Sequence, residues 1–165
     1  MFDQGAYIIY KFGKIEIFLN MAGKNFTIFF LLTISFEISA QWCPEQIEII
    51  RDQWGVPHIY APTDAQVSYG LAWAHAEDDF ETIQTTLLAA KSMLGLHLGK
   101  EGAVVDYVVR LLRAKEIVEE NLSKVSPKFL KLVKGYLAGM NAYAAEHPKE
   151  VFVKKAFPIT VQDVF

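Results

Sequence analysis

The fold of this 165-residue chain is decided by residues 47–80, which read IEIIRDQWGVPHIYAPTDAQVSYGLAWAHAEDDF. Residues 47–51 and 57–61 are apolar at alternating positions, a pattern that predicts two short strands. Gly55 lies between them and predicts a turn or a bulge. We therefore expect the ordered part of the chain to begin with two neighbouring strands.

Helix signals follow the strands. Thr63 and Gln66 match a capping box, in which each side chain bonds the other residue's backbone N–H, so a helix is expected to begin there. The body of this helix is apolar on nearly every side, which predicts burial. Helical spacing predicts that this first stretch continues to about Leu94, with Gly95 as the left-handed stop. It predicts a second helical stretch over 103–122, and a third from Ser126-Pro127 to His147-Pro148.

Three details of these helices carry predictions. Val104, Tyr107, Val108, Leu111 and Leu112 form one apolar stripe of the 103–122 stretch. Gly135 and Gly139 each cost a helix about 1 kcal/mol relative to alanine, which indicates a close backbone contact with a neighbour. Thr160 and Asp163 form a further cap near the end of the chain, where a helix of barely one turn is unstable by itself.

Composition excludes several classes of protein. The chain is 52% hydrophobic and 21% charged, which excludes a disordered segment. Its net charge of −3 shows no basic excess, so no nucleic-acid partner is expected. The single cysteine, Cys43, permits neither an internal disulfide nor a cysteine-rich metal site, and the bulky Trp42 before it argues against a lipid-anchored residue.

The first forty residues are expected to direct export rather than to fold. Residues 26–36 read FTIFFLLTISF, an uncharged run too short for a span of about 20 apolar residues. With its basic flank and small-residue exit it predicts a secretory signal over 21–40, cleaved after Ala40, in preference to an uncleaved anchor or a buried strand. Met21 opens this segment better than Met1, so residues 1–20 are expected to be a mis-assigned start or a leader. We expect a periplasmic or secreted protein without a membrane span.

One cluster of candidate ligands falls within one and a half helical turns. His75, Glu77, Asp78 and Asp79 could bind a metal, but the helical zinc pattern places a second histidine four residues after the first, and position 79 is aspartate. The favoured interpretation is structural: Asp78 ties the helix to neighbouring backbone or to an arginine, while its neighbours are solvated.

The remaining candidates are weaker. Residues 95–100 faintly resemble a phosphate-binding loop, but the spacing is one residue short and no Ser or Thr follows, so an exposed loop is favoured. His58 is expected to be a structural strand residue rather than a catalytic base. No G-x-S-x-G elbow exists, and nothing activates Cys43. From the residues alone we predict no catalytic, cofactor-binding or metal-ligating residue in this chain, which then reads as an exported, helix-rich piece of a larger protein.

Four short blocks of sequence carry further information about fold and function. RDQWGVPHIYA (51–61), YGLAWAHAED (69–78), GYLAGMNAY (135–143) and FPIT (157–160) together resemble, in order, the start of the A chain of the penicillin acylase family. The resemblance covers about residues 46–165. Relatives of penicillin G acylase usually have Gln and Arg beside the acid of the second block, where this chain has Glu77 and Asp79. That departure makes the pattern more similar to the acylases of acyl-homoserine lactones, aculeacin and cephalosporins.

The resemblance implies an α+β fold, the N-terminal fragment of an αββα sandwich of the N-terminal-nucleophile hydrolases, mostly helical with two short strands. Residues 41–165 would be the first part of the A chain, truncated at its C-terminus. Such enzymes are exported as zymogens that cut themselves into an A and a B chain. The B chain's first residue, a serine, attacks the amide carbonyl, and its own α-amino group, with a pKa near 7.7–8.0, acts as the base.

These groups cannot be assigned to this sequence. The serine, the donors that stabilise the oxyanion and the family's calcium ligands would all lie beyond Phe165, so calcium is expected only in the full-length protein. Arg51, Asp78 and Asn141 would be structural. The expected partners are the remainder of the A chain, the B chain and a small-molecule acyl amide.

The expected function is therefore part of an exported hydrolase of linear amides, acting on a β-lactam, an acyl-homoserine lactone or a lipopeptide. The isolated chain is expected to be inactive and poorly soluble. Two alternatives stay open: a small exported helical binding or interaction module without catalysis, and a metal-dependent hydrolase that uses the His75 cluster.

Overall fold

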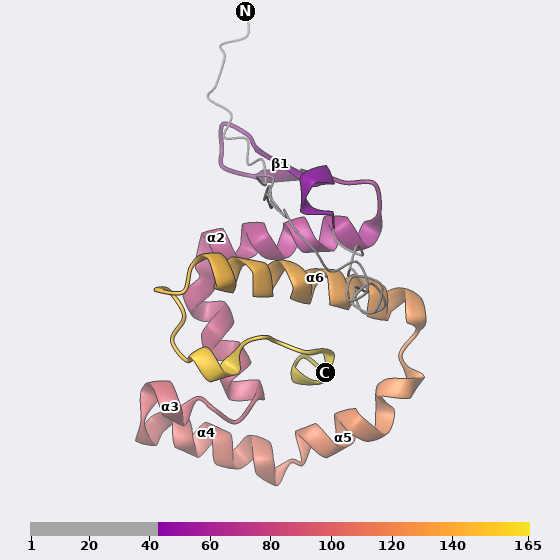
Figure 1. Cartoon of the computed structure of the whole chain (residues 1–165). Helices are drawn as coiled ribbons and strands as arrows, with labels where there is room; N and C mark the ends of the chain where they lie inside the picture. The colour runs from indigo at the N-terminus through magenta and orange to yellow at the C-terminus, as the bar shows by residue number, and fades with distance from the viewer. Residues whose placement is uncertain (1–42) are drawn as a thin grey trace, which may run out of the picture.

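The computed structural model describes residues 43–165, so the predictions for the leader and the signal segment lie outside the described residues (Figure 1). Its strands are β1 (Glu48–Arg51) and β2 (Pro57–Tyr60). Its α-helices are α2 (Asp64–Ala90), α3 (Gly95–Leu98), α4 (Lys100–Leu111), α5 (Ala114–Asn121) and α6 (Pro127–Glu146). Short 3-10 turns are η1 (Pro44–Gln46), η2 (Leu122–Lys124), η3 (Lys154–Ala156) and η4 (Val161–Asp163). The predicted α+β class, mostly helical with two short strands, is confirmed.

The two strands form an antiparallel hairpin, with Glu48 opposite Tyr60 and Arg51 opposite Pro57. Gly55 occupies the turn with a φ of 80°, a conformation that glycine adopts without steric cost, so the predicted turn is confirmed. The hairpin packs directly on the first half of α2. At Gly70 of that helix, a Cβ atom would approach Ile59 to 2.7 Å, and this position therefore has no room for a side chain.

The start of α2 differs in one respect from the predicted capping box. The Thr63 hydroxyl oxygen accepts the Gln66 backbone N–H at 3.3 Å, as expected. The Gln66 side chain, however, does not return to the backbone of Thr63. Its Oε1 accepts the Thr63 hydroxyl at 2.8 Å and its Nε2 donates to Gln46 Oε1 at 3.2 Å. The second hydrogen bond of the capping box is therefore absent, and the Gln66 amide instead links η1 to α2.

The end of α2 was predicted at about Leu94 and is observed at Ala90. Gly95 is not the left-handed stop that its position favours, since it begins α3. Ser92 takes the left-handed conformation instead, with a φ of 51°. The chain turns three residues earlier than predicted, and residues 95–98 form a one-turn helix where a loop was expected.

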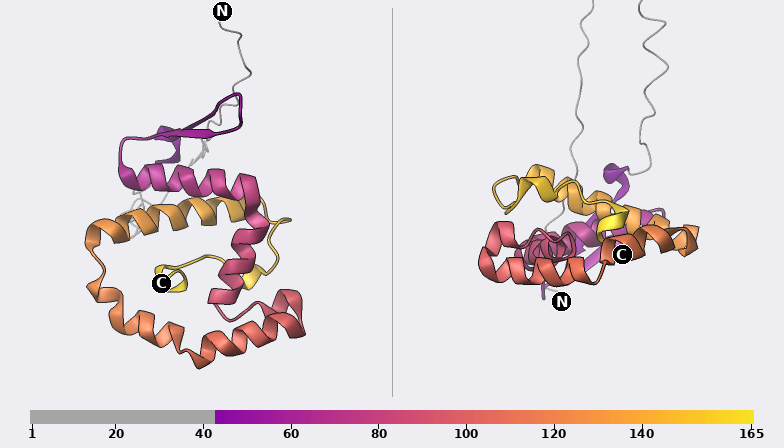
Figure 2. Two further views of the ribbon diagram at one scale, coloured as in Figure 1. Left: turned by 180° about the vertical axis from the view of Figure 1, so that it is seen from behind. Right: turned by 90° about the horizontal axis from the view of Figure 1, so that it is seen from below.

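The core lies between α2 and α6, and the first half of α2, before its kink at Asp79, runs beside α6 (Figures 1 and 2). Ser126 caps α6 by accepting the Phe129 backbone N–H at 3.2 Å, and the helix ends at Glu146 just before His147, so both predicted ends are confirmed. At Gly139 a Cβ atom would collide with the Tyr69 carbonyl, which confirms the predicted close backbone approach. The buried aromatic residues of this core are Tyr69, Trp73, Phe80 and Tyr143.

The stretch predicted as one helix over 103–122 is two helices. Arg113, with a φ of 54°, separates α4 from α5. Together with α3 they lead from the end of α2 back toward the start of α6, and the C-terminal segment lies inside the resulting ring (Figures 1 and 2). No helix between residues 43 and 165 is both long and apolar enough to cross a membrane.

The C-terminal segment is held at two points. Asn141 of α6 donates to the Ile159 carbonyl at 3.0 Å and accepts the Ile159 N–H at 2.7 Å. The predicted cap at Thr160 is confirmed, because Asp163 accepts the Thr160 N–H at 2.7 Å and also pairs with Lys91 Nζ at 2.8 Å. These contacts fix η4 against the end of α2.

Candidate functional site

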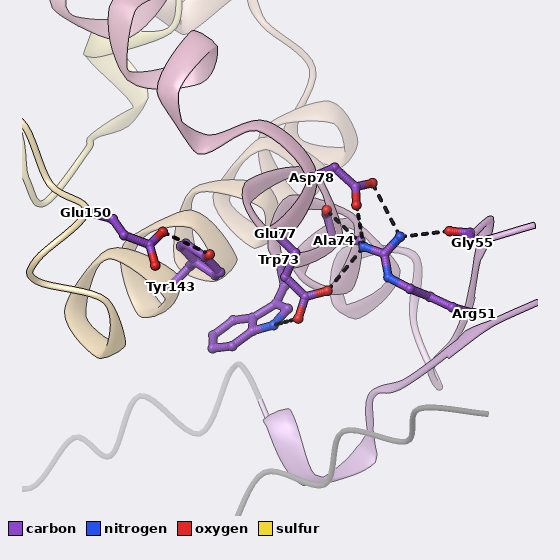
Figure 3. Close-up of polar contacts among 8 residues, drawn as sticks. All are labelled: Arg51, Gly55, Trp73, Ala74, Glu77, Asp78, Tyr143 and Glu150. Carbon is purple, nitrogen blue, oxygen red and sulfur yellow. Dashed lines mark hydrogen bonds and ion pairs between the residues drawn. The ribbon is translucent and has the colours of Figure 1, made fainter. Parts of the chain in front are cut away.

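The densest polar cluster joins the hairpin to α2 (Figure 3). Arg51, the last residue of β1, places Nη2 2.7 Å from Asp78 Oδ1 and 3.2 Å from Glu77 Oε2. The same nitrogen donates to the Ala74 carbonyl at 3.4 Å, and Nη1 donates to the Gly55 carbonyl at 2.8 Å. We call these five residues the arginine junction.

The charges of the arginine junction stabilise one another. Partial burial lowers the pKa of Arg51, but the hydrogen bonds and charges of Asp78 and Glu77 outweigh that effect and raise the pKa above its usual value. The other oxygen of Glu77, Oε1, accepts the Trp73 indole N–H at 3.0 Å. Both oxygens of this largely buried carboxylate are therefore occupied by the chain itself. This arrangement holds two elements together, and it confirms that Asp78 ties the helix to an arginine.

The other members of the predicted His75 cluster point to different partners. His75 Nδ1 lies 3.2 Å from the Tyr136 hydroxyl on α6. Asp79 interrupts α2 with a φ of −159°, and its Oδ1 accepts the Thr82 backbone N–H at 3.1 Å, as an N-cap of the second half of the helix. Hydrogen bonds from the Thr82 backbone and side chain lower the pKa of Asp79. His75 and Asp79 therefore have partners of their own, whereas Glu77 and Asp78 share Arg51.

An open hollow of about 380 Å³ lies beside the kink. Its acidic lining residues are Glu77, Asp78, Asp79, Glu81 and Glu150. Glu150 Oε2 accepts the Tyr143 hydroxyl at 3.1 Å (Figure 3). Across residues 43–165, no three His, Cys, Asp or Glu side chains are grouped so that they could hold a metal ion.

The remaining predicted candidates have structural partners. His58 Nε2 lies 3.5 Å from Asp52 Oδ2, and the other Asp52 oxygen accepts the Trp54 and Val56 N–H groups of the hairpin turn. Residues 95–100 present exposed side chains as expected, but the Gly95 N–H that could face a phosphate donates to Asp106 at 2.9 Å. Cys43 is partly exposed. Throughout the described part of the chain, no serine or threonine hydrogen-bonds to a histidine.

Two positions were missed by the sequence analysis. Glu77 is expected from the sequence to be solvated, yet it bridges Trp73 and Arg51, a tertiary arrangement that spacing does not show. Gln84 is buried in α2, where its Nε2 donates to the Glu150 carbonyl at 3.0 Å and its Oε1 accepts the Phe152 N–H at 2.8 Å. The sequence offered no signal for this second role, because Gln84 stands among Thr82, Thr85 and Thr86 and only its burial shows that its amide needs partners.

Comparisons with known proteins agree with this description. The sequence profile described as Penicillin amidase matches residues 46–162. Penicillin acylase 2 proenzyme of Pseudomonas sp. (strain SE83) is 29% identical over 99 residues, which are 60% of this chain and 13% of that protein. Acyl-homoserine lactone acylase PvdQ of Pseudomonas savastanoi pv. phaseolicola is 24% identical over 128 residues, 73% of this chain and 16% of that protein.

A solved structure has a similar fold. The thermostable penicillin G acylase from Alcaligenes faecalis aligns with a TM-score of 0.60 and 24% identity, over 72% of this chain and 67% of that chain. The curated relatives are much longer, and this chain spans 12% to 19% of their lengths. Penicillin acylases and acyl-homoserine lactone acylases match at similar identities, so the expected preference within the family stays a prediction. Since the profile covers most of the chain, this polypeptide belongs to the penicillin amidase family.

Proposed function

We propose that this chain is the N-terminal structural part of an exported acylase, a hydrolase of linear amides. The observation that carries the proposal is the family match over residues 46–162. The curated relatives are named as penicillin acylases and acyl-homoserine lactone acylases. The substrate would be a small acyl amide: a β-lactam, an acyl-homoserine lactone or a lipopeptide.

In this proposal the reacting groups lie in polypeptide outside this chain. An N-terminal serine would attack the amide carbonyl, its own α-amino group would accept the hydroxyl proton, and the amine would leave with a proton. Water would then hydrolyse the acyl-serine ester and release the carboxylic acid. The small share of the relatives' length that the chain spans supports this division. The polar groups of the arginine junction also support it, since they bind one another instead of remaining available to a substrate.

The chain's own contribution would be mechanical. The arginine junction holds the hairpin on α2, and the Asn141 bonds hold the C-terminal segment on α6. Together they would present strands and helices on which the rest of the sandwich assembles. Export would use the segment over 21–40, and processing of a zymogen would separate the chains. Any calcium site would belong to the full-length protein outside residues 43–165.

The test compares the complete protein, from the organism that encodes it, with a form lacking residues 41–165. Each is incubated with penicillin G, a cephalosporin and an acyl-homoserine lactone, and the released amine is quantified. The proposal predicts hydrolysis of at least one amide by the complete protein alone. A complete, folded protein that hydrolyses none of the amides but binds another protein would favour the interaction module instead.

A further inference from the structure

Helix α4 faces the rest of the chain with the side that carries Gly102 and Asp106. Gly102, Asp106 and Arg110 are four residues apart and therefore lie on one face of the helix. Gly102 is buried, with no room for a Cβ atom beside the Leu94 carbonyl. The Asp106 carboxylate accepts the Leu94 N–H at 2.8 Å and the Gly95 N–H at 2.9 Å. Arg110 Nη2 donates to the Ser92 carbonyl, in the turn between α2 and α3, at 3.4 Å. The inward side of α4 therefore contributes these hydrogen bonds, one glycine and the half-buried Val109.

The apolar side of α4 is exposed. Val104, Tyr107, Val108 and Leu111 follow the i, i+3, i+4, i+7 spacing of a buried helix face, yet 65%, 66%, 46% and 66% of their surfaces are exposed. Residues two positions apart point about 200° apart on a helix, so this stripe lies opposite Gly102 and Asp106. Leu112, 65% exposed, extends it. We call these five apolar residues the α4 stripe.

Helix α4 is oriented the opposite way from a surface helix in a domain that folds without a partner. An amphipathic helix of a globular protein normally turns its apolar stripe to the core and its charges to water. Here the hydrogen bonds of Asp106 to two backbone N–H groups fix the helix in the opposite sense. Contiguous exposed apolar surface of this kind marks a surface that a partner covers.

The α4 stripe contains no charged residue, so its partner should present apolar side chains. A second copy of this chain fits poorly. Helix α4 has 12 residues, a length of about 18 Å, and two facing stripes would bury well under the roughly 800 Å² per partner of a standard interface. The same stripe suffices as one patch of a larger interface. The relatives supply such a partner, because this chain spans only 13% and 16% of the two described above.

We propose that the α4 stripe is the surface on which the remaining, larger part of the same acylase packs. This inference rests on the proposed function for the identity of the partner. Beyond that function, it assigns the contact to one face of one helix. The reversed orientation of α4 exposes that face to the partner. Helix α4 would then stabilise the assembled enzyme rather than the chain that carries it.

Photo-cross-linking in the complete protein tests this contact. The benzophenone amino acid p-benzoylphenylalanine replaces Tyr107 in the stripe and, as the control, Lys115, whose side chain is 80% exposed on α5. After irradiation in the producing organism, linked peptides are identified by mass spectrometry. The expected product at position 107 joins this chain to penicillin amidase family sequence outside residues 43–165, at least tenfold above position 115. Linkage to a second copy, to lipid or to nothing, or equal yields at both positions, would overturn the proposal.

A pair of substitutions provides an independent test. Leu111→Asp is compared with Leu96→Asp, because Leu96 lies on α3 outside the stripe and is 65% exposed, nearly the same as Leu111. Leu111→Asp should lower co-purification of the rest of the acylase at least tenfold, while Leu96→Asp should not. Equal circular dichroism spectra of the two variant chains check that both fold. Equal co-purification by both would contradict the proposal.

Amide hydrolysis, measured on the same samples, separates the two ideas. The expected cross-link without any hydrolysis would refute the proposed function and leave the interface standing. Hydrolysis by a protein that gives no such cross-link would support the proposed function and refute the proposed interface.

Discussion

Arg51 Nη2 and Asp78 Oδ1 lie 2.7 Å apart, although 26 residues separate them in the chain. This ion pair joins the end of β1 to the last residue before the kink of α2 at Asp79. Asp78 is half-exposed, so water screens its share of the attraction. The neighbouring Glu77 is largely buried and depends more strongly on the arginine. The arginine junction therefore fixes the hairpin chiefly through Glu77.

Replacement of this arginine tests the junction. Arg51→Met should lower the free energy of unfolding by about 1–3 kcal/mol, because the buried Glu77 loses a charged partner. Urea unfolding of the dilute chain, followed by circular dichroism, measures the change. Lys131→Met removes an exposed cation from α6 and serves as the control, with an expected change within about 0.5 kcal/mol. Equal effects would mean that the junction contributes nothing specific.

The contact between α2 and α6 predicts a strict size limit at Gly139. Gly139→Ala should destabilise the chain by about 1–3 kcal/mol through overpacking against the Tyr69 carbonyl, even though alanine is the better helix former by about 1 kcal/mol. Ala145→Ser also adds one heavy atom to α6, at an exposed position, and should have little effect. A stabilised Gly139→Ala variant in the same urea experiment would contradict the close approach.

The pair between Lys91 and Asp163 predicts a pH dependence. Partial burial raises the pKa of Asp163, but the hydrogen bonds from Lys91 and Thr160 outweigh it and lower the pKa below its usual value. A depressed folded-state pKa stabilises the protein above the unfolded pKa of about 3.9, and this contribution is lost as the pH falls through the folded value.

Asp163→Asn should therefore cost about 1–2 kcal/mol at pH 7, and the difference from the parent chain should shrink steadily below about pH 4. Amide hydrogen exchange at Thr160, whose N–H is bonded to Asp163, reports this locally. A difference that stays constant from pH 7 to pH 3 would show that the carboxylate charge has no part in fixing η4.

The exposed α4 stripe predicts poor solubility of the isolated chain. Residues 41–165 should bind the dye ANS and sediment as a concentration-dependent mixture, because exposed apolar surface associates. Leu111→Ser together with Val108→Ser should reduce both effects severalfold, whereas Leu96→Ser on α3 should change them less. A monodisperse parent chain without dye binding would contradict this expectation.

Local signals predicted α6 well. Ser126-Pro127 and His147-Pro148 fix its ends through their own backbone chemistry, and the Thr160–Asp163 cap is equally local. The turns at Ser92 and Arg113 escaped prediction because both residues adopt a positive φ, a conformation that the sequence signals only where glycine or asparagine is present.

The candidate site likewise has contacts that the sequence predicts and contacts that it does not. An arginine was one of the two anchors expected for Asp78, the other being neighbouring backbone. The bridging role of Glu77 could not be expected, because it depends on the angle at which the hairpin crosses α2. The stripe on α4 was correctly identified from its spacing. Its exposure was not predictable, because it follows from the backbone bonds that Asp106 makes on the opposite side.

Our proposal makes this chain part of an amide hydrolase whose reacting groups lie in other polypeptide. It is tested most directly by the release of free amine from penicillin G and an acyl-homoserine lactone, measured in parallel for residues 41–165 alone and for the complete protein. We predict hydrolysis by the complete protein and none above the buffer rate by residues 41–165. Amide hydrolysis by residues 41–165 alone would contradict the account.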